Sequence, residues 1–388
     1  MAKEESLLSL KLHLFIFNAT NTIIISFLPI YLKYKGLMST EIGWVLATGL
    51  LASIFSQVFW GYISDKYKVV KRILLICTYG FLVSSFIFFQ LTDVVAILMV
   101  GAVFYFFSTP IGALIDSLAQ RKAIKNGVSF GSIRTWGSIG FAASSLIVGK
   151  ILALIGIQHL IWPFLFLGFM TLFSTYRLKD VKAATDKVRL HNVQQLIKNK
   201  PLLIFLLLIL LLSISHRTND NFISLYIIQL GGSENLVGIS WFIAVLSDAI
   251  IFAFAGFWYK KYHPMLFIIV AGVLYSLRWF TYSIINEPIL IVSLQFLNGL
   301  TFACFYIAAF DYISRLIPSI LKSTGHLLFY AIFFGLSGII GSILGGILFD
   351  TFGGGTLYFV MGCLALVGTT LTTVHYTPSF RKNIESGI

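Results

Sequence analysis

The sequence predicts an all-α membrane protein with twelve transmembrane helices in two six-helix bundles. Of its 388 residues, 58% are hydrophobic and only 11% are charged, and the mean hydropathy is +0.91. A soluble protein of this length cannot bury so much apolar surface, so we expect a bilayer to cover it. Because a spanning helix needs about 20 residues, the chain is long enough for about twelve spans joined by short turns.

The apolar runs give the expected positions of the spans. They cover residues 12–33, 42–64, 73–92, 94–119, 129–154, 160–177, 202–228, 236–259, 264–285, 288–314, 323–349 and 356–376. When these spans cross a bilayer alternately, most basic residues of the connections lie on one side, and the other side holds little beyond Lys33, Lys35 and Lys150. This positive-inside distribution places both termini in the cytoplasm of a multi-pass cell-membrane protein. The net charge of +13 therefore reflects membrane topology, and no nucleic-acid partner is expected.

A polar segment divides the chain into two halves. Residues 179–200 follow the sixth apolar run and are rich in charge, so we expect a cytoplasmic linker between bundles at 1–178 and 201–388. A weak internal repeat supports this division, because Gly137-Ser-Ile-Gly140 in span five matches Gly338-Ile-Ile-Gly341 in span eleven. Two halves with the same orientation are typical of a pseudo-symmetry axis along the membrane normal.

Two charges within the apolar runs stand out, Asp116 in span four and Arg134 in span five. Burying an arginine in hydrocarbon is costly unless it is paired or lines a wet cavity, so such a residue marks a functional site. The polar stretch Gln120–Asn126 between the two is expected to be a short turn. Asp116 and Arg134 then share a depth on neighbouring antiparallel helices, and we expect them to form an ion pair in a polar cavity.

The first span carries two amides, Asn18 and Asn21, on one helix face. That face is interpreted either as the wall of a cavity or as a surface that forms hydrogen bonds to a neighbouring helix. Pro29 is expected to bend the outer end of this helix.

The connection between spans two and three contains a recognisable motif. It reads Gly61-Tyr-Ile-Ser-Asp65-Lys66-Tyr-Lys68-Val-Val-Lys71-Arg72. The order glycine, three residues, aspartate and basic residue resembles the signature cytoplasmic loop of the major facilitator superfamily of transporters. The segment departs from that pattern at Lys68, where a glycine is common, and the basic pair that follows is displaced. The resemblance implies a conformational gate, with Gly61 at a close helix contact, Asp65 accepting hydrogen bonds from a helix N-terminus, and Lys66 at the inner membrane surface.

A second stretch, Phe130 to Phe141, narrows the resemblance. Its order Phe-Gly-x-x-Arg-x-Trp-Gly-Ser-x-Gly-Phe resembles the branch that contains phenylpropionate permeases and is similar to the lactose permease. In the lactose permease an acidic residue on the fourth helix and an arginine on the fifth hold the sugar, at the positions of Asp116 and Arg134. Ser138 and Phe141 fall where that family has further cavity residues. The resemblance therefore implies a substrate site around these side chains.

The residues for proton coupling differ from those of the lactose permease. That permease uses a lysine, a histidine and a glutamate in span ten, and the matching positions here are Gln295, Asn298 and Thr301. None of these side chains titrates near neutral pH, so we expect a carboxylate elsewhere to carry the proton.

The candidate proton carriers are Asp248, Asp220 and Asp311. Asp248 is about twelve residues into span eight, near the bilayer centre, and Arg278 in span nine reaches a similar depth. Asp248 and Arg278 are interpreted either as a pair that loads and releases a proton or as a static structural ion pair.

The expected function is proton-coupled uptake of a small polar organic solute by alternating access. A sugar or glycoside is ranked slightly ahead of an aromatic acid or a nucleoside, and a monomer within the lipid bilayer is expected. One alternative is a proton-coupled drug or metabolite exporter of the same fold, although span five lacks the proline that exporters often carry there. Another is a membrane enzyme or sensor, but the sequence shows no clustered nucleophile or ligand-spaced histidines, so neither enzyme activity nor a cofactor or metal is expected.

Overall fold

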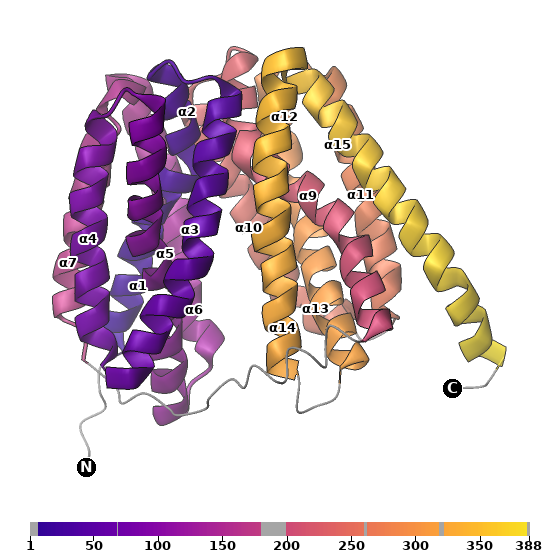
Figure 1. Ribbon diagram of the computed structural model, residues 1–388. Coiled ribbons are helices and arrows are strands. Elements are labelled where there is room, and N and C mark those ends of the chain that lie inside the picture. Colours follow the sequence, from indigo (N-terminus) through magenta and orange to yellow (C-terminus); the bar gives the residue numbers. More distant parts are fainter. Residues whose placement is uncertain (1–6, 68, 180–198, 260–261, 318–321, 386–388) are drawn as a thin grey trace. The chain divides into compact units, whose positions relative to one another are not determined.

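The computed structural model describes residues 7–67, 69–179, 199–259, 262–317 and 322–385, and nearly all of them are helical (Figure 1). The α-helices are α1 (Leu8–Thr22), α2 (Leu28–Tyr34), α3 (Ser39–Tyr67), α4 (Val70–Gln90), α5 (Val94–Lys125), α6 (Phe130–Ile155), α7 (Ile161–Tyr176), α9 (Lys200–Gln229), α10 (Glu234–Trp258), α11 (Pro264–Ile284), α12 (Pro288–Ser293), α13 (Cys304–Leu316), α14 (Lys322–Tyr330) and α15 (Ser337–Glu385). The predicted linker at 179–200 lies almost wholly outside the described residues.

Short 3-10 and π-helical turns interrupt the spans. The 3-10 turns are η2 (Ile157–His159) and η4 (Leu294–Leu297), and the π-helical turns are η1 (Ile23–Phe27), η5 (Gly299–Ala303) and η7 (Ala331–Leu336). The turn η1 ends two residues before Pro29, which has no backbone N–H to donate into the preceding turn. The structure therefore has a π-helical turn directly before α2, ending two residues before Pro29.

Eleven helical segments in the described ranges are long and apolar enough to span a membrane. The last of them, Gly325–Tyr376, has 52 residues. Gly353 interrupts it with φ 81° and ψ 171°, a conformation that glycine adopts without steric penalty. This residue lies in the connection that the sequence places between its last two apolar runs.

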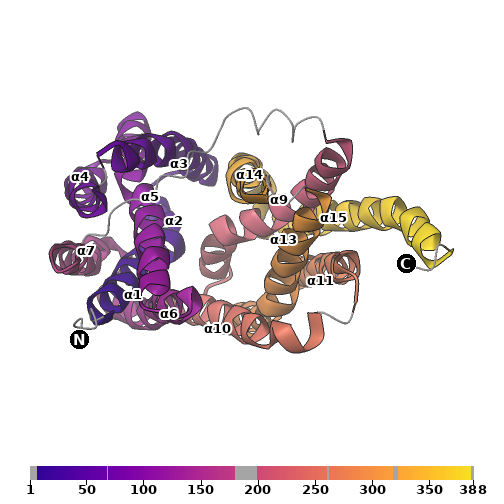
Figure 2. The ribbon, with the colours of Figure 1, turned by 90° about the horizontal axis from the view of Figure 1, so that it is seen from below.

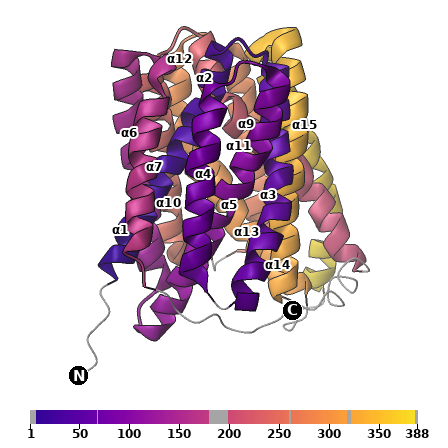
Figure 3. The ribbon, with the colours of Figure 1, turned by 60° about the vertical axis from the view of Figure 1, so that its left-hand side comes forward.

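The chain folds into two compact units, of which the first takes in Met1–Asp186 and Gly231–Phe242. In this unit α1 packs against α6 and α7, and α5 packs against α3 and α4 (Figures 1 and 2). Figure 3 shows α4 and α7 running side by side. The beginning of α10 belongs here because a Cβ on Gly238 would lie 2.1 Å from the carbonyl oxygen of Ser145 on α6.

Small residues also bring α1 and α6 together. A Cβ on Gly140 would lie 2.1 Å from the carbonyl oxygen of Phe15, so a larger residue has no space there. One turn further along α6, the Ser144 hydroxyl donates to the carbonyl oxygen of Ala19 at 2.8 Å. These contacts fix the position of α6, which carries Arg134.

The second unit takes in Lys187–Leu230 and Ile243–Ile388. In it α15 packs against α9 and α11, and α11 packs against α13. Glycines allow the close approach of α15 to α9, since a Cβ on Gly341 would lie 2.6 Å from the Thr218 hydroxyl.

The polar stretch Gln120–Asn126 is not the short turn that the sequence predicts. Helix α5 continues to Lys125, and the connection to α6 is shorter, with Gly127 at φ 64°. The reason is that the stretch is amphipathic, because Ala119, Lys122 and Ala123 are buried on one helix face while their neighbours are more exposed.

The motif that starts at Gly61 also differs from the prediction. Helix α3 runs to Tyr67, so Asp65 and Lys66 belong to its last turn and not to a loop. A Cβ on Gly61 would meet no atom of the described chain within 4 Å. The expected close helix contact at Gly61 is therefore absent from the described part of this structure.

Candidate functional site

The ion pair between Asp116 and Arg134 is present. Nε of Arg134 on α6 lies 3.1 Å from Oδ1 of Asp116 on α5, and the two side chains are 40% and 39% exposed respectively. Both residues lie within membrane-capable helices, so the predicted juxtaposition is confirmed. A half-exposed charge pair at such a position offers both a guanidinium and a carboxylate to a polar solute.

Asn18 of α1 joins this pair at the surface of α6. A Cβ on Gly137 would lie 2.7 Å from Nη1 of Arg134 and 2.7 Å from Nδ2 of Asn18, so glycine leaves room for both side chains. The Asn18 amide also donates to the carbonyl oxygen of Leu14 at 2.9 Å. Asn18 therefore faces a neighbouring helix and lies beside the arginine at the same time.

The other predicted residues of this region are half-buried around the same two helices. Asn21 lies one turn beyond Asn18 on α1, and Ser138 lies one turn beyond Arg134 on α6. The ring of Phe141 packs edge-on against Trp241, with ring centroids 5.8 Å apart. We call Asn18, Asn21, Asp116, Arg134, Ser138 and Phe141 the α6 site.

A second cluster surrounds Arg278 of α11, which is 1% exposed. Its Nε donates to the Tyr282 hydroxyl at 3.2 Å, and Nη1 donates to Asn298 at 3.0 Å and to Thr301 at 3.2 Å. Its Nη2 donates to Oε1 of Gln295. The three span-ten residues that replace the titratable set of the lactose permease are thus all hydrogen-bonded to one arginine.

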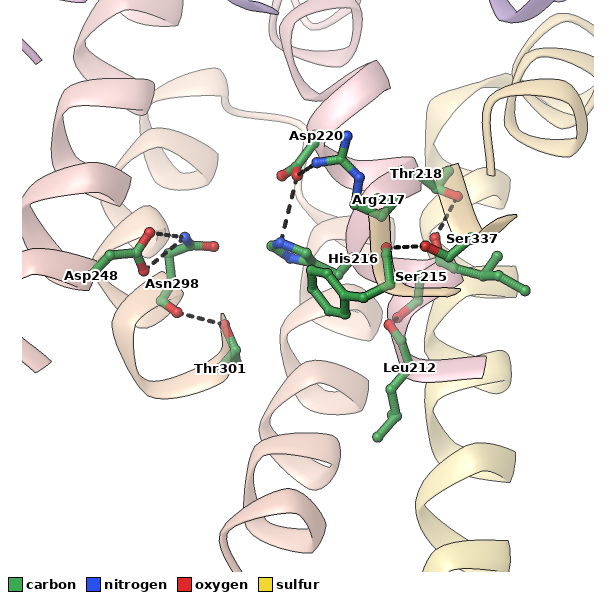
Figure 4. Close-up of polar contacts among 12 residues, drawn as sticks. Leu212, Ser215, His216, Arg217, Thr218, Asp220, Asp248, Asn298, Thr301 and Ser337 are labelled. Atoms are coloured by element: carbon green, nitrogen blue, oxygen red, sulfur yellow. Dashed lines mark hydrogen bonds and ion pairs between the residues drawn. The ribbon is translucent and has the colours of Figure 1, made fainter. Parts of the chain in front are cut away.

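Arg278 and Asp248 do not form the direct pair that the sequence predicts. The Asn298 amide lies between them. Its Nδ2 donates to both carboxylate oxygens of Asp248 at 3.1 Å each (Figure 4), and its Oδ1 accepts from Arg278. The guanidinium is instead stabilised by neutral oxygens and by the rings of Trp279 and Tyr282, whose centroids lie 4.8 and 5.3 Å from Cζ. We call Asp248, Asn298 and Arg278 the bridged triad.

The sequence identifies all members of this arrangement as candidate residues but does not show how they contact one another. Gln295, Asn298 and Thr301 are three residues apart, which on a helix places them near one face. That spacing was the available signal, because three consecutive acceptors on one face can satisfy a buried arginine. Whether these three side chains contact Arg278 depends on the irregular turns η4 and η5. The spacing of hydrophobic residues in the sequence does not predict such turns.

Asp220 of α9 belongs to a third group of charges in the second unit. Its Oδ2 lies 2.6 Å from Nη1 of Arg217 and 3.5 Å from Nε2 of His216 (Figure 4). The prediction named Asp220 as a possible proton carrier but did not identify Arg217 and His216 as its partners.

Asp311 is held apart from these groups at the end of α13. Its Oδ2 accepts from Nη2 of Arg315 at 2.8 Å and from the Tyr259 hydroxyl at 2.8 Å. Burial, together with the hydrogen bond to this carboxylate, raises the pKa of the Tyr259 phenol, so Tyr259 remains a donor at neutral pH.

The remaining motif residues lie at the end of α3. Nζ of Lys66 lies 5.8 Å from the ring centroid of Tyr62 and 5.7 Å from that of Tyr67. The side chain of Asp65 lies outside what the structure describes, so its expected contact with a helix N-terminus stays a prediction. Among the described residues, no group of three or more His, Cys, Asp or Glu side chains has a geometry that would hold a metal ion.

The sequence model of a protein family described as the MFS_1 like family matches residues 7–360. The chain belongs to this family. Its members are transporters of the major facilitator superfamily and not enzymes, so the family resemblance of the sequence is confirmed.

Relatives of this MFS_1 like protein carry the names of transporters. An uncharacterized transporter, YwbF, of Bacillus subtilis (strain 168) is 27% identical over 93% of this chain and 90% of its own. The maltose permease of Geobacillus stearothermophilus is 24% identical over 88% of this chain and 87% of its own. The probable 3-phenylpropionic acid transporter of Escherichia coli (strain K12) is 24% identical over 89% of this chain and 91% of its own.

Two solved structures have the same fold. The crystal structure of the nucleoside transporter NupG superposes with a TM-score of 0.87 at 18% identity, over 96% of this chain and 99% of that one. The D-xylose-proton symporter superposes with a TM-score of 0.70 at 13% identity, over 94% of this chain and 96% of that one. The fold of the chain is thus that of a major facilitator superfamily transporter.

Proposed function

We propose that the protein imports a small polar organic solute together with protons, by alternating access, as a monomer in the cell membrane. The observation that carries this proposal is the half-exposed ion pair of Asp116 and Arg134, which lies within two long apolar helices. An arginine in a membrane helix is expensive unless it serves a polar solute or a wet cavity. The names of the relatives, which include permeases for a disaccharide and a probable aromatic-acid transporter, support a solute rich in oxygen.

The proposal includes twelve spans in two six-helix bundles, at 1–178 and 201–388, with a cytoplasmic linker at 179–200 and both termini in the cytoplasm. A continuous helix of the 52 residues in Gly325–Tyr376 would be about 78 Å long at about 1.5 Å per residue, more than twice the hydrocarbon thickness of about 30 Å. The backbone of Gly353 supports two spans there.

The α6 site is proposed to hold the solute. The planar guanidinium of Arg134 donates two parallel hydrogen bonds to an oxygen-rich group, and Asp116 either orients it or accepts from a solute hydroxyl. The amides of Asn18 and Asn21, the hydroxyl of Ser138 and the ring of Phe141 complete the surface. A sugar or glycoside fits this set slightly better than a nucleoside or an aromatic acid, because hydroxyls bond both charges.

Asp248 is proposed as the proton carrier. Its hydrogen-bond partner is the neutral Asn298, so its ionisation is not locked by a direct ion pair with Arg278. Asp311 is a weaker candidate because Arg315 contacts it directly. The gate formed by Gly61, Asp65 and Lys66 is proposed to set the balance between the two access states.

Export of a drug or metabolite is the second candidate. Helix α6 has no proline, whereas exporters of this fold often have one in that helix. This difference favours import.

The test is transport into proteoliposomes that contain the purified protein. Radiolabelled maltose, uridine and 3-phenylpropionate are supplied outside, and an inward proton gradient is imposed by an alkaline interior. We expect one of them to accumulate and to be lost when an uncoupler is added, while protein-free liposomes accumulate none. Accumulation only when the interior is acidic would indicate an antiporter and would overturn the proposal of proton-coupled uptake.

A further inference from the structure

A groove opens on the surface of the first unit between α6 and α7. Its volume is about 160 Å³, and α1, which packs against both helices (Figure 2), contributes to its lining. All three helices belong to membrane-capable segments. We call this space the α6–α7 groove, and its lining includes Ala19 of α1, Ala143, Ser144, Ile147 and Ile151 of α6, and Phe166 of α7.

The lining of the α6–α7 groove is apolar. Among the described residues that form it, only Ser144 has a polar side chain, and its hydroxyl already donates to the carbonyl oxygen of Ala19 at 2.8 Å. Ser144 and Ala19 are both buried, so they lie at the bottom of the groove. An apolar cavity of about 150 Å³ stays dry and takes up apolar molecules instead of water. The groove is therefore suited to hydrocarbon.

The rim of the groove faces the lipid phase. Ile147 on the α6 wall and Phe166 on the α7 wall are 59% and 65% exposed. Phe166 belongs to a stripe of exposed apolar side chains on α7 that also contains Trp162, Phe169 and Phe173. Because these residues recur at intervals of three and four, they share one helix face. Lipid tails are as apolar as such side chains, so they cover this face of a membrane-spanning helix and can enter the groove.

A cation lies at the end of the groove that is on the proposed outer side of the membrane. Lys150 is exposed and follows Ile147 by three residues, so the two side chains are neighbours on the surface of α6. Trp162, in the first turn of α7, lies at the same end, and tryptophan is typical of the membrane interface. From Lys150 a lysine side chain reaches toward the headgroups, where it attracts phosphate. The groove and Lys150 thus match the two parts of a phospholipid, its hydrocarbon chain and its anionic phosphate.

We propose that the α6–α7 groove binds one acyl chain of a phospholipid from the outer leaflet, with the phosphate of that lipid beside Lys150. Within a bilayer the hydrophobic effect does not distinguish the groove from other lipid tails. The affinity comes from van der Waals contacts with a shaped apolar wall and from the charge of Lys150. The bound chain fills the space between α6 and α7 and so stabilises the first unit. This lipid is a ligand of the membrane-facing surface and not the transported solute.

The first test counts the lipids that the full-length protein retains. Purified protein is freed of lipid in detergent, mixed with dioleoylphosphatidylglycerol and analysed by native mass spectrometry. We expect one lipid to stay bound to the wild type at a collision energy that removes all others. Ala143→Phe places a ring in the groove and should retain none. The matched control is Ala102→Phe, which should retain one lipid, because Ala102 lies beside the exposed Val103 on α5 and does not line the groove.

The second test follows the melting temperature as the same lipid is added. The wild type should gain about 2–4 °C, whereas Ala143→Phe should gain nothing. Ile147→Ala removes part of an exposed wall and should need about fivefold more lipid, which gives a result even if Ala143→Phe fails to fold. Lys150→Gln should need about threefold more lipid, and the control Lys33→Gln, an exposed lysine on the same proposed side, should match the wild type. Glycerophosphate, which has the phosphate without the chains, should cause no gain.

Four outcomes would overturn the proposal. If the wild type retains no lipid, the groove is not a lipid site. If Ala143→Phe or Ile147→Ala binds the lipid as tightly as the wild type does, the acyl chain lies elsewhere, and an unchanged affinity in Lys150→Gln would place the phosphate elsewhere. If the wild type is a dimer that Ala143→Phe converts into a monomer, the groove binds a second copy of this chain. Neither test measures solute uptake, so the transport proposal stands or fails separately.

Discussion

The amide of Asn298 donates to both carboxylate oxygens of Asp248, at 3.1 Å each, and its own oxygen accepts from Arg278 at 3.0 Å. Asn298 is oriented by charge on both sides, with nitrogen toward the anion and oxygen toward the cation. The arginine thus acts on Asp248 through a dipole and not through contact. A carboxylate held in this way is stabilised but stays free to take up a proton.

The first prediction concerns Asn298→Ala. This change removes a donor from Asp248 and an acceptor from Arg278, so we expect a loss of about 1–3 kcal/mol in stability and the loss of proton-driven uptake. Thr301→Val is the matched control, because Thr301 contacts Arg278 at 3.2 Å through its hydroxyl. It should lower the melting temperature similarly and yet keep the pH response of transport. Equal pH responses of Asn298→Ala and wild type would show that the bridge has no part in coupling.

The second prediction concerns the α6 site. Arg134→Lys should abolish uptake, because an ammonium group cannot reproduce the planar fork of the guanidinium that contacts Asp116. Asp116→Asn should do likewise, and both variants should reach the membrane in normal amounts. Uptake by proteoliposomes is the measurement, with Arg177→Lys as the control. Wild-type rates in Arg134→Lys would remove Arg134 from the binding site.

The third prediction concerns Asp65 at the end of α3. Asp65→Asn should slow transport and increase the labelling of engineered cysteines from the cytoplasmic side, because the state closed to the cytoplasm loses a charge-dependent contact. The affinity for the solute should change little. Asp93→Asn is the control, since Asn can replace Asp93 as the cap that accepts from the Ala96 amide. A large loss of affinity in Asp65→Asn with unchanged labelling would contradict a gating role.

The fourth prediction compares two glycines. Gly140→Ala should destabilise the protein by several kcal/mol, because its Cβ would lie 2.1 Å from the Phe15 carbonyl oxygen and would push α1 away from α6. Gly61→Ala should keep or raise stability by roughly 0.5–1 kcal/mol, since its Cβ meets nothing within 4 Å and alanine favours a helix. Thermal unfolding in detergent measures both. Similar melting temperatures for the two variants would show that α1 and α6 can separate easily.

The spans and the ion pair of Asp116 and Arg134 could be predicted because their signals are strong and local. A run of about 20 apolar residues has few alternatives to a membrane helix, and a lone arginine in such a run needs a partner. The end of α5 could not be placed in the same way. Lys122 has the polarity of a turn residue but is buried on a helix face, and only the packing around it extends the helix to Lys125.

The spacing of the span-ten acceptors indicates one helix face, but the position of Asn298 in the bridged triad could not be predicted because the geometry of span ten is irregular. The turns η4 and η5 change the angle between successive side chains, so a regular helical wheel does not place Asn298 between Asp248 and Arg278. The partners of Asp220 could not be predicted for a different reason. The sequence places Asp220 in a long apolar span, but its contacts with His216 and Arg217 are visible only when the surrounding packing is known.

The last prediction is the test of Asp248 itself. If Asp248 carries the driving proton, Asp248→Asn fixes the neutral state, because an amide cannot ionise. Uphill uptake driven by a proton gradient should then fall to the level of protein-free liposomes, while exchange of labelled for unlabelled solute down its own gradient persists. Exchange survives because it requires only the alternation of the loaded protein and no net proton release.

Asp311→Asn is the matched control for this variant. Asp311 accepts from Arg315 and Tyr259 and so belongs to a structural pair, and Asp311→Asn should lower stability without removing uphill uptake. In Asp248→Asn, the side-chain amide oxygen of the new residue can still accept from Nδ2 of Asn298, which keeps the triad assembled. A loss of coupling in this variant can therefore be distinguished from a folding defect. Intact uphill uptake in Asp248→Asn would exclude Asp248 from the mechanism. Loss of uphill uptake in Asp311→Asn alone would indicate that Asp311, at the end of α13, carries the proton.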